Sequence, residues 1–278
     1  MTVLPRIRSL TLDEVQVLLD WAEAEGWNPG LTDAAAFRAA DPAGFIGCFV
    51  GDRMTAGISA VRYGSAFGFI GLYIAHPDFR GKGYGRMVWD AATAHLEGRT
   101  IGLDGVPEQQ ANYSKIGFEA AYETGRWSGT LAVPAPAEVQ TANVDMLAAL
   151  LAYEREAFPA ERIAFLTEWL QPPRVAKVLI RNGRAEGYAV CRQCHYGWKI
   201  GPLFAATAAD AELLLRACAA EAKQAPLQID VPDMQRDFVE RLQGLGFTKG
   251  FMTARMYRGR RPEAPMNRVF GITTLELG

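Results

Sequence analysis

Residues 69–118 read FIGLYIAHPDFRGKGYGRMVWDAATAHLEGRTIGLDGVPEQQANYSKIGF, and this stretch decides the fold. Residues 69–75 form an apolar run with the length and the β-branched or aromatic character of a buried strand. A turn at Pro77 and a glycine-rich segment follow, and from Arg86 onward apolar side chains recur at three- and four-residue spacing. The pattern predicts a strand, a glycine-rich loop and a helix in succession.

The glycine-rich loop covers residues 80–85 and reads RGKGYG. Glycines let consecutive backbone N–H groups converge, and the N-terminus of the following helix adds a positive partial charge. This combination predicts a cradle for a phosphate or pyrophosphate, with Lys82 and Arg86 available to balance its charge. The alternative is an ordinary turn in which glycine only permits the chain to reverse.

Two other phosphate-binding patterns do not fit this loop. The Walker pattern ends in GK[ST], but Lys82 is followed by Gly83. The dinucleotide fingerprint G-x-G-x-x-G lacks its last glycine, because Gly85 is followed by Arg86, Met87 and Val88. The remaining pattern is R-x-x-G-x-G.

This pattern resembles the Q/R-x-x-G-x-G/A signature of the GNAT superfamily of acyl-CoA-dependent N-acetyltransferases. A second segment, YSKIGF from Tyr113 to Phe118, is similar to the Y-x-K-x-G-F segment of that family and follows in the expected order. The resemblance covers about Val3 to Leu131. It implies a mixed α/β sheet, acetyl-CoA as the acyl donor and a coenzyme site made by Arg80, Gly81, Lys82, Gly83, Tyr84, Gly85 and Arg86.

The resemblance also implies a primary amine as the usual acceptor. A backbone N–H in the stretch Tyr73, Ile74 and Ala75 is expected to donate a hydrogen bond to the thioester oxygen. Tyr113 is the candidate general acid, because a phenol with a pKa of about 10 stays protonated at neutral pH; its alternative role is a packing aromatic. The general base is left open among Glu25, His76, Asp104, His195 and Asp230.

Two further groups of residues are candidate substrate contacts. Trp27 and Asn28 follow the first predicted helix, where the loop of a GNAT fold borders the acceptor; a tryptophan that fills space between helices is equally compatible. Asp104 and Asp230 end predicted strands, where helix capping is as good an explanation as catalysis. Residues 118–123 and 126–131 are predicted as the last two strands of this region.

The composition of the whole chain is that of a globular protein with two domains. It has 278 residues, 49% hydrophobic and 22% charged, with a formal net charge of −2 and no run of five or more like charges. Nucleic acid is therefore not an expected partner, and no apolar stretch is long enough to span a membrane. The N-terminal sequence has no apolar signal region, so we expect a cytoplasmic protein. The oligomeric state stays open, a homodimer included.

The motif CRQCH, from Cys191 to His195, matches the c-type haem attachment pattern. Haem attachment would require export, which nothing in the sequence provides. A structural zinc site would need a second pair of cysteines. The motif continues an apolar run, so we interpret it as strand sequence and expect no metal.

The chain repeats itself after a proline-containing linker at residues 132–138. Ile70-Gly71 is echoed by Ile200-Gly201, and Leu103-Asp104 by Ile229-Asp230, at offsets of 126 to 130 residues. The sequence thus predicts a GNAT domain at 1–131 and a second GNAT-like domain with a C-terminal tail at 139–278. Residues 267–277 of this tail are expected to dock as an added strand.

The second domain has lost the coenzyme signature. The equivalent of the glycine-rich loop, residues 206–212, reads ATAADAE, and Leu242 stands where the first half has Tyr113. We expect this domain to bind no coenzyme and to close the acceptor cleft. The favoured interpretation is acetyl transfer to a small-molecule amine, with an acyl-CoA-binding sensor or a protein N-acetyltransferase as alternatives.

Overall fold

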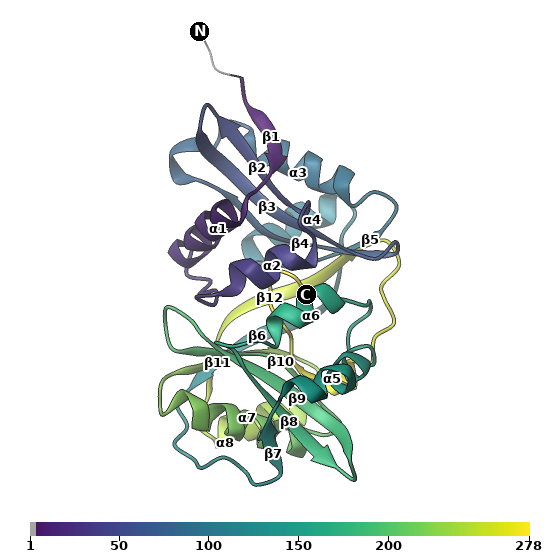
Figure 1. Cartoon of the computed structure of the whole chain (residues 1–278). Helices are drawn as coiled ribbons and strands as arrows, with labels where there is room; N and C mark the ends of the chain where they lie inside the picture. Colours follow the sequence, from purple (N-terminus) through teal and green to yellow (C-terminus); the bar gives the residue numbers. More distant parts are fainter. Residues whose placement is uncertain (1–3) are drawn as a thin grey trace.

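The structure is a computed structural model that describes residues 4–278, apart from the side chain of Val144. Its strands form one mixed sheet in the order β1-β2-β3-β4-β5-β12-β6-β11-β10-β9-β8-β7, with β13 beside β10. Figure 1 shows two halves, one above the other, with helices on both sides of the sheet. The mixed α/β architecture expected from the sequence is confirmed.

The first half contains the elements predicted around the glycine-rich loop. They are β1 (Arg6–Ser9), α1 (Leu12–Ala24), α2 (Asp33–Ala40), β2 (Phe45–Val50), β3 (Arg53–Tyr63), β4 (Phe67–Ala75), η1 (Pro77–Phe79), α3 (Tyr84–His95), β5 (Thr100–Gly105) and α4 (Pro107–Lys115). Thr11 and Glu14, three residues apart, predict a capping box. Helix α1 begins there: Thr11 accepts from the backbone N–H of Glu14, and the Glu14 carboxylate accepts from the backbone N–H of Thr11.

Strands β4 and β5 are parallel and separate after a short common stretch. Their pairing ends at Ile70 and Leu103. Directly beyond it, Leu72 has a φ of 47° and the register between β3 and β4 shifts, which marks a β-bulge. The edge of β4 that faces β5 therefore has no strand partner after Ile70, and the two strands form an opening below the glycine-rich loop.

The second half repeats this order of elements. It contains β7 (Val139–Thr141), η2 (Val144–Met146), α5 (Leu147–Glu154), α6 (Ile163–Trp169), β8 (Val175–Arg181), β9 (Arg184–Gln193), β10 (Trp198–Ala205), α7 (Ala208–Ala222), β11 (Leu227–Pro232) and α8 (Arg236–Gly244). The pair Asn182-Gly183 between two strand-like runs predicts a hairpin turn, and β8 and β9 do pair across it, with positive φ at both residues. The linker predicted at 132–138 contains no helix or strand.

The corresponding opening in the second half is filled by the chain itself. Strands β10 and β11 are parallel only up to Ile200 and Ile229. Beyond that point β13 (Val269–Gly271), which follows η3 (Met266–Arg268), pairs antiparallel with β10, and the N–H of Ile272 donates to the carbonyl of Asp230. The expectation that the tail adds a strand is confirmed for Val269–Gly271.

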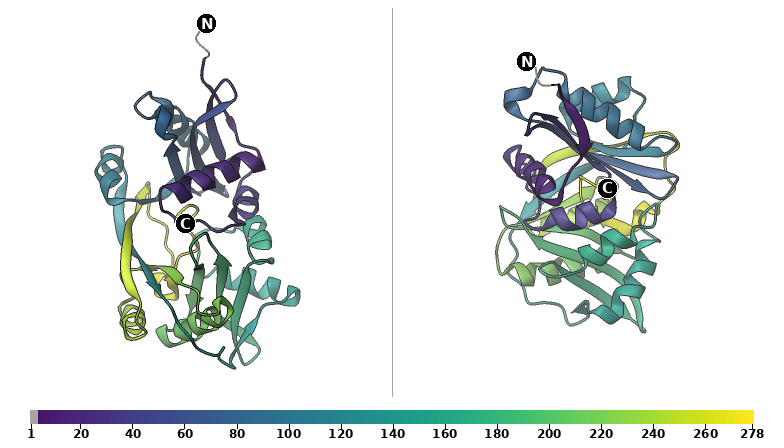
Figure 2. Two further views of the ribbon diagram at one scale, coloured as in Figure 1. Left: turned by 90° about the vertical axis from the view of Figure 1, so that its left-hand side faces the viewer. Right: turned by 45° about the horizontal axis from the view of Figure 1, so that its top comes forward.

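The two halves exchange their last strands. Strand β6 (Glu119–Gly129) follows the first half in sequence but pairs with β11 of the second half. Strand β12 (Thr248–Arg258) ends the second half but pairs with β5 of the first, and β6 and β12 also pair with each other. In Figures 1 and 2 these two strands cross between the halves. Backbone hydrogen bonds thus join the halves into one sheet.

This exchange corrects the prediction of two final strands at 118–123 and 126–131. The structure has one strand, β6, over this range, and the neighbour expected from the local chain is supplied by β12. The alternating apolar and polar residues 3–10 predict an opening strand, which is observed as β1, Arg6–Ser9, while Val3 lies outside the described residues. The sequence also predicts a helix at about 160–169, and this helix, α6, begins three residues later, at Ile163.

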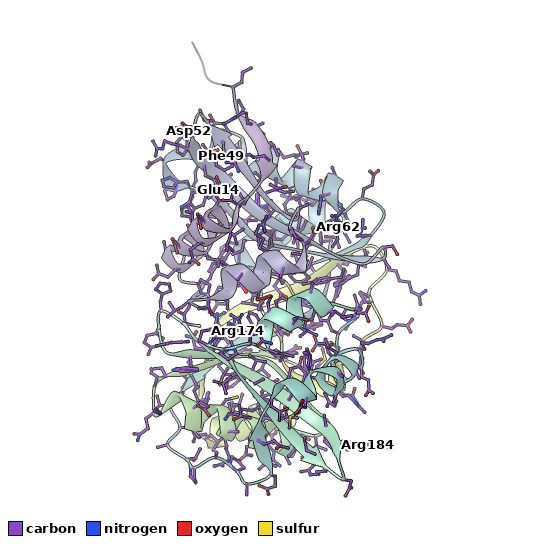
Figure 3. All side chains as sticks on the ribbon, in the orientation of Figure 1. Glu14, Phe49, Asp52, Arg62, Arg174 and Arg184 are labelled. Atoms are coloured by element: carbon purple, nitrogen blue, oxygen red, sulfur yellow. The ribbon has the colours of Figure 1, made fainter. Side chains whose placement is uncertain are left out.

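The halves also pack through side chains. Phe37 of α2 stacks on Trp169 of α6, with ring centroids 6.0 Å apart, and both side chains are fully buried. Figure 3 shows side chains filling the space between the halves, with Arg174 at their junction. The C-terminus lies in the middle of the molecule in every view of Figures 1 and 2. Within residues 4–278, no helix combines the length and the apolarity that crossing a membrane requires.

Candidate active site

A cavity of about 510 Å³ lies where β4 and β5 separate. Its wall includes Trp27 from the loop after α1, Tyr73 from β4, Tyr113 from α4, Phe251 from β12 and Glu276 from the C-terminal tail. The volume is in the range of about 300–1,000 Å³ that is usual for small-molecule sites. Residues from both halves therefore form this one site.

The glycine-rich loop begins at Arg80, which lines the cavity, and leads into α3. Several backbone N–H groups of this loop lack a backbone acceptor among the described residues. Gly81 and Gly83 have φ values of 75° and 85°, and Gly83 is the residue before α3. A Cβ atom at either glycine would meet no other atom within 4 Å, so it is the backbone conformation that requires glycine. The backbone N–H groups of residues 81–84 have no backbone acceptor within the described part of the chain. The loop can therefore offer these donors to an anion.

Arg80 connects the loop to the end of α1. Its guanidinium forms an ion pair with Glu25 and donates from Nε to the carbonyl of Ala75, 3.1 Å away. Both Arg80 and Glu25 line the cavity. Arg80 thus holds the start of the loop against β4 and α1.

Two other basic residues of the loop bind to neighbouring groups. The Nζ of Lys82 donates to the carbonyl of Asp78, 2.9 Å away, and Arg86 forms an exposed ion pair of 2.7 Å with Asp90 one turn along α3. Because both side chains are exposed and flexible, they can still add positive charge near the loop.

Tyr113 lies on the cavity wall with a free hydroxyl group. Its ring stacks on Trp89, with centroids 5.6 Å apart, and Trp89 also contacts Tyr73 at 5.3 Å. The Tyr113 hydroxyl has no hydrogen-bond partner in the described residues. Burial, with a smaller contribution from Tyr73, raises the pKa of Tyr113 to about 12. The phenol is therefore protonated at neutral pH.

The stretch from Tyr73 to Ala75 also lines the cavity, at the open edge of β4. Tyr73 approaches the glycine-rich loop, since a Cβ atom at Gly85 would lie 3.1 Å from the Tyr73 hydroxyl. Tyr84, the first residue of α3, is half-buried and packs edge-on against Phe79. The structure thus brings the predicted loop, strand and tyrosine to one place.

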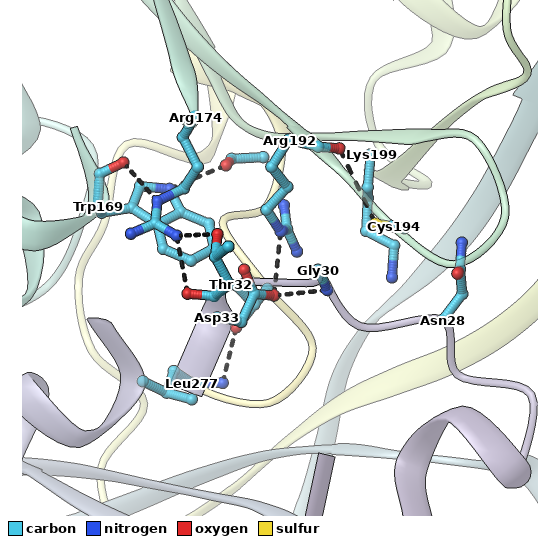
Figure 4. Close-up of polar contacts among 12 residues, drawn as sticks. Asn28, Gly30, Thr32, Asp33, Trp169, Arg174, Arg192, Cys194, Lys199 and Leu277 are labelled. Carbon is cyan, nitrogen blue, oxygen red and sulfur yellow. Dashed lines mark hydrogen bonds and ion pairs between the residues drawn. The ribbon is translucent and has the colours of Figure 1, made fainter. Parts of the chain in front are cut away.

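The loop after α1 is held by the second half, as Figure 4 shows. Trp27 lines the cavity, and its carbonyl accepts from Arg126 and from Lys199. Asn28 is not part of the cavity wall; its side chain instead bonds to the backbone of Tyr196 in the second half. Asn28 is therefore not placed to contact an acceptor in the cavity directly.

A buried ion pair also attaches this loop to the second half. Arg192 donates from Nε to Asp33, 3.1 Å away, and both residues are fully buried. Arg174 donates to Thr32 in the same region. Removing one partner of a buried pair typically costs about 3–5 kcal/mol, so the second half fixes the loop firmly.

Asp104 and Asp230 occupy equivalent positions in the two halves, and each is paired with an arginine from an exchanged strand. Asp104 of β5 accepts two hydrogen bonds from Arg255 of β12, at 2.8 and 2.9 Å. Asp230 of β11 accepts two from Arg126 of β6, at 2.8 and 3.0 Å. Asp104 lines the cavity, whereas Asp230 does not.

These pairs decide the charge state of the two carboxyl groups. At Asp230 burial raises the pKa, but Arg126 and Lys199 outweigh it and the pKa is lowered. Burial raises the pKa of Asp104 against the opposing charge of Arg255. Since an arginine stays protonated, both carboxylates are occupied as ion-pair partners at neutral pH.

The two histidines considered as general bases lie away from the cavity wall. His76 accepts a hydrogen bond from the N–H of Asp78 and packs against Trp21. His195 is exposed in the turn between β9 and β10. Cys191 and Cys194 beside it are buried, and no group of three or more His, Cys, Asp or Glu residues in the described chain is placed to hold a metal ion.

The second half has a different helix N-terminus at the position of the glycine-rich loop. Thr207 caps α7 by accepting from the N–H of Asp210, and the Asp210 carboxylate pairs with Arg181 at 2.6 Å. Side chains of the protein thus already supply the negative charge at the start of this helix.

Arg126, Arg255 and Glu276 are among the cavity or junction residues that the sequence analysis did not single out. Arg126 and Arg255 are related by the same offset as the repeat, so the repeat could have revealed them as a matched pair. Glu276 has no counterpart of this kind, because only the folded tail carries it into the cavity.

Comparisons with known proteins agree with this geometry. Residues 10–118 match the model of the acetyltransferase (GNAT) family, and residues 150–271 match that of an acetyltransferase (GNAT) domain. The chain is 34% identical over 272 residues to the holothin acyltransferase of Pseudoalteromonas sp. (strain SANK 73390), covering 96% of this chain and 92% of the relative.

Solved structures show the same fold. A putative acetyltransferase from Pyrococcus horikoshii superimposes with a TM-score of 0.81 at 21% identity, covering 99% of this chain and 96% of that chain. A tandem GNAT protein from the clavulanic acid biosynthesis pathway gives a TM-score of 0.61 at 13% identity, covering 93% and 100%. Together with the two family matches and the relative of nearly equal length, these likenesses establish that the chain belongs to the GNAT family and is an acyltransferase built from two GNAT folds.

Proposed function

We propose that this enzyme transfers an acetyl group from acetyl-CoA to a primary amine of a small molecule. One observation carries the proposal: the open edge of β4 and Arg80 line the same cavity, and the free backbone donors of residues 81–84 directly follow Arg80. The pyrophosphate would bind at Arg80, Gly81, Lys82, Gly83, Tyr84, Gly85 and Arg86, where converging N–H groups and the start of α3 favour an anion.

The open edge of β4 suits the rest of the coenzyme. The arm that carries the thiol contains amide groups, which can pair with backbone groups on the open edge of β4 in the stretch Tyr73, Ile74 and Ala75. Strand β13 supports this idea, because it fills the equivalent opening of the second half by the same kind of backbone pairing. A backbone N–H of this stretch would then stabilise negative charge on the thioester oxygen as the amine attacks.

The second half is proposed to bind no coenzyme. Its helix α7 is capped by Thr207, and Asp210 carries negative charge at that helix start. Its strand opening is occupied by β13. This half instead holds the loop that carries Trp27 and contributes Phe251 to the cavity wall.

Tyr113 is proposed to protonate the departing thiolate. Its hydroxyl is free and lies on the cavity wall. The raised pKa makes the phenol a weaker acid, but the same burial disfavours a thiolate in the cavity and so raises the pKa of its conjugate acid above the usual value of about 8.5. The proton would therefore move as the carbon–sulfur bond breaks.

The acceptor is proposed to be small because both halves close the cavity. Trp27 and Asp104 are the predicted substrate contacts that reach it. The relative at 34% identity is named for acyl transfer to holothin, which supports a defined compound as acceptor. That name says acyl, so the donor tested should include longer acyl chains beside acetyl.

The test is thiol release from acetyl-CoA by the purified protein, measured against a panel of small amines and of peptides with free N-termini or lysines. We expect release above the spontaneous rate with one or more small amines. Peptides as better acceptors would indicate a protein N-acetyltransferase. Tight acetyl-CoA binding without release for any acceptor would indicate a sensor and overturn the proposed reaction.

A further inference from the structure

The C-terminal tail, residues 272–278, forms part of the cavity wall. After β13 it turns at Thr274, and the carbonyl of Glu276 accepts from the hydroxyl of Ser59 at 3.2 Å. The carbonyl of Leu277 accepts from Tyr63 at 2.9 Å, and that of Gly278 accepts from Arg162 at 3.3 Å. These bonds to β3 and to the segment before α6 fix the tail between the halves.

The tail passes beside the point where β4 and β5 separate. A Cβ atom at Gly71 would lie 2.2 Å from the carbonyl oxygen of Glu276, so only glycine permits this contact. Gly71 directly follows Ile70, the last residue of β4 that pairs with β5, and precedes the bulge at Leu72. Glu276 is therefore at the inner end of the opening in which the thioester is proposed to lie.

Glu276 differs from the other carboxylates of the cavity wall. Glu25 is paired with Arg80, and Asp104 is paired with Arg255. The side chain of Glu276 forms no hydrogen bond or ion pair with any described residue, although only 3% of the residue is exposed. A buried carboxylate on a residue that lines the cavity, with no partner among the described residues, is available to a ligand.

Several charged groups face Glu276 from the second half and from β6. Its charge acts on Arg126, Arg192 and Lys199, and Asp33 and Asp230 are further acids of this cluster. Burial and Arg126 lower the pKa of Lys199 to about 8, while Asp230 and Glu276 oppose this shift. The surrounding cations offset part of the cost of burying the Glu276 carboxylate.

We infer that Glu276 accepts the proton that the acceptor nitrogen loses during acyl transfer. The inference rests on the proposed function and supplies the general base that the sequence leaves open. The neutral amine attacks the thioester carbon, the carbon–nitrogen bond forms and the carbon–sulfur bond breaks. The nitrogen gives one proton to Glu276, and the departing sulfur takes one from Tyr113. Transfer of a proton from Glu276 to the Tyr113 phenolate through solvent restores both groups.

The test compares Glu276→Gln with the wild-type enzyme on an amine that the wild type acetylates. We expect kcat to fall by about 10²-fold or more, with unchanged acetyl-CoA affinity by calorimetry and an unchanged melting temperature. Glu263→Gln, at a surface pair with Arg260, is the matched control and should behave as wild type.

Activity of Glu276→Gln within about threefold of wild type would overturn the inference. If this variant melts early or binds acetyl-CoA differently, Glu276→Ala decides instead. Recovery of its rate by added sodium formate supports a proton-accepting role, and no recovery overturns it. A wild-type enzyme that acetylates no amine would refute the proposed function itself, so the two failures are distinguishable.

Discussion

Two glycines at equivalent positions, Gly71 in β4 and Gly201 in β10, each make room for the same tail. A Cβ atom at Gly201 would lie 2.3 Å from the carbonyl oxygen of Thr273, and one at Gly71 would lie 2.2 Å from that of Glu276. The repeated Ile-Gly in the sequence thus reflects a close approach of backbone, not a turn. A single segment of seven residues uses both sites and joins the halves through them.

Tyr113→Phe gives the residue-scale prediction. If the phenol protonates the leaving thiolate, its loss should lower kcat by about 10²-fold and leave acetyl-CoA affinity unchanged. Because the pKa of Tyr113 is raised to about 12, the wild-type rate should show no loss from phenol ionisation up to about pH 10. Steady-state kinetics across pH measure both effects. An unchanged kcat in Tyr113→Phe would leave the tyrosine as a packing aromatic.

At the scale of elements, the starts of α3 and α7 show how two copies of one fold diverge. Helix α3 has glycine before its first residue and no side-chain cap, so its N-terminal groups stay available. Helix α7 has Thr207, whose hydroxyl accepts from the N–H of Asp210. The two helix starts therefore differ in the residue that precedes them, which is glycine before α3 and a capping threonine before α7.

Substitution of Gly83 by valine tests the first of these helix starts. At a φ of 85° a β-branched residue is strained, so the loop should change its path and its N–H groups should no longer converge. We expect acetyl-CoA affinity to fall more than about tenfold by calorimetry. Gly98→Val is the control, because Gly98 has a φ of 78° and equal free space but lies after α3. Equal affinity in both variants would show that the loop does not hold the coenzyme.

At the scale of the whole molecule, the strand exchange makes the two halves one structural unit. Strands β6 and β12 lie between β5 and β11, and each carries an arginine that pairs with an aspartate of the other half. Neither half can separate without breaking backbone ladders and exposing these charges. The cavity that lies between them therefore keeps its shape.

We accordingly predict one cooperative unfolding transition for the full chain. Calorimetric and van't Hoff enthalpies should agree, and fluorescence and circular dichroism should give the same midpoint. Residues 1–131 alone should not give the native first half, because β5 would lack β12 and leave its edge open. Two separate transitions, or a stable and coenzyme-binding fragment 1–131, would contradict this view.

Much of the fold and part of the site could be predicted because their signals are local. The strand, loop and helix around Gly81 and Gly83 depend on residues that are neighbours in sequence. The turn at Asn182 and Gly183 and the cap at Thr11 are of the same kind. The pairing of β6 and β12 with the opposite halves could not be predicted, since both strands have patterns that fit either neighbour.

The sequence by itself determined two GNAT-like halves, a glycine-rich loop in only the first of them, and a tyrosine placed after it. These features follow from glycine conformation, helix starts and periodic apolar side chains, all of which act over a few residues. The tertiary structure alone decided which acids are free. It paired Asp104 and Asp230 with arginines of the exchanged strands and left Glu276 unpaired in the cavity, because those contacts join residues more than a hundred positions apart.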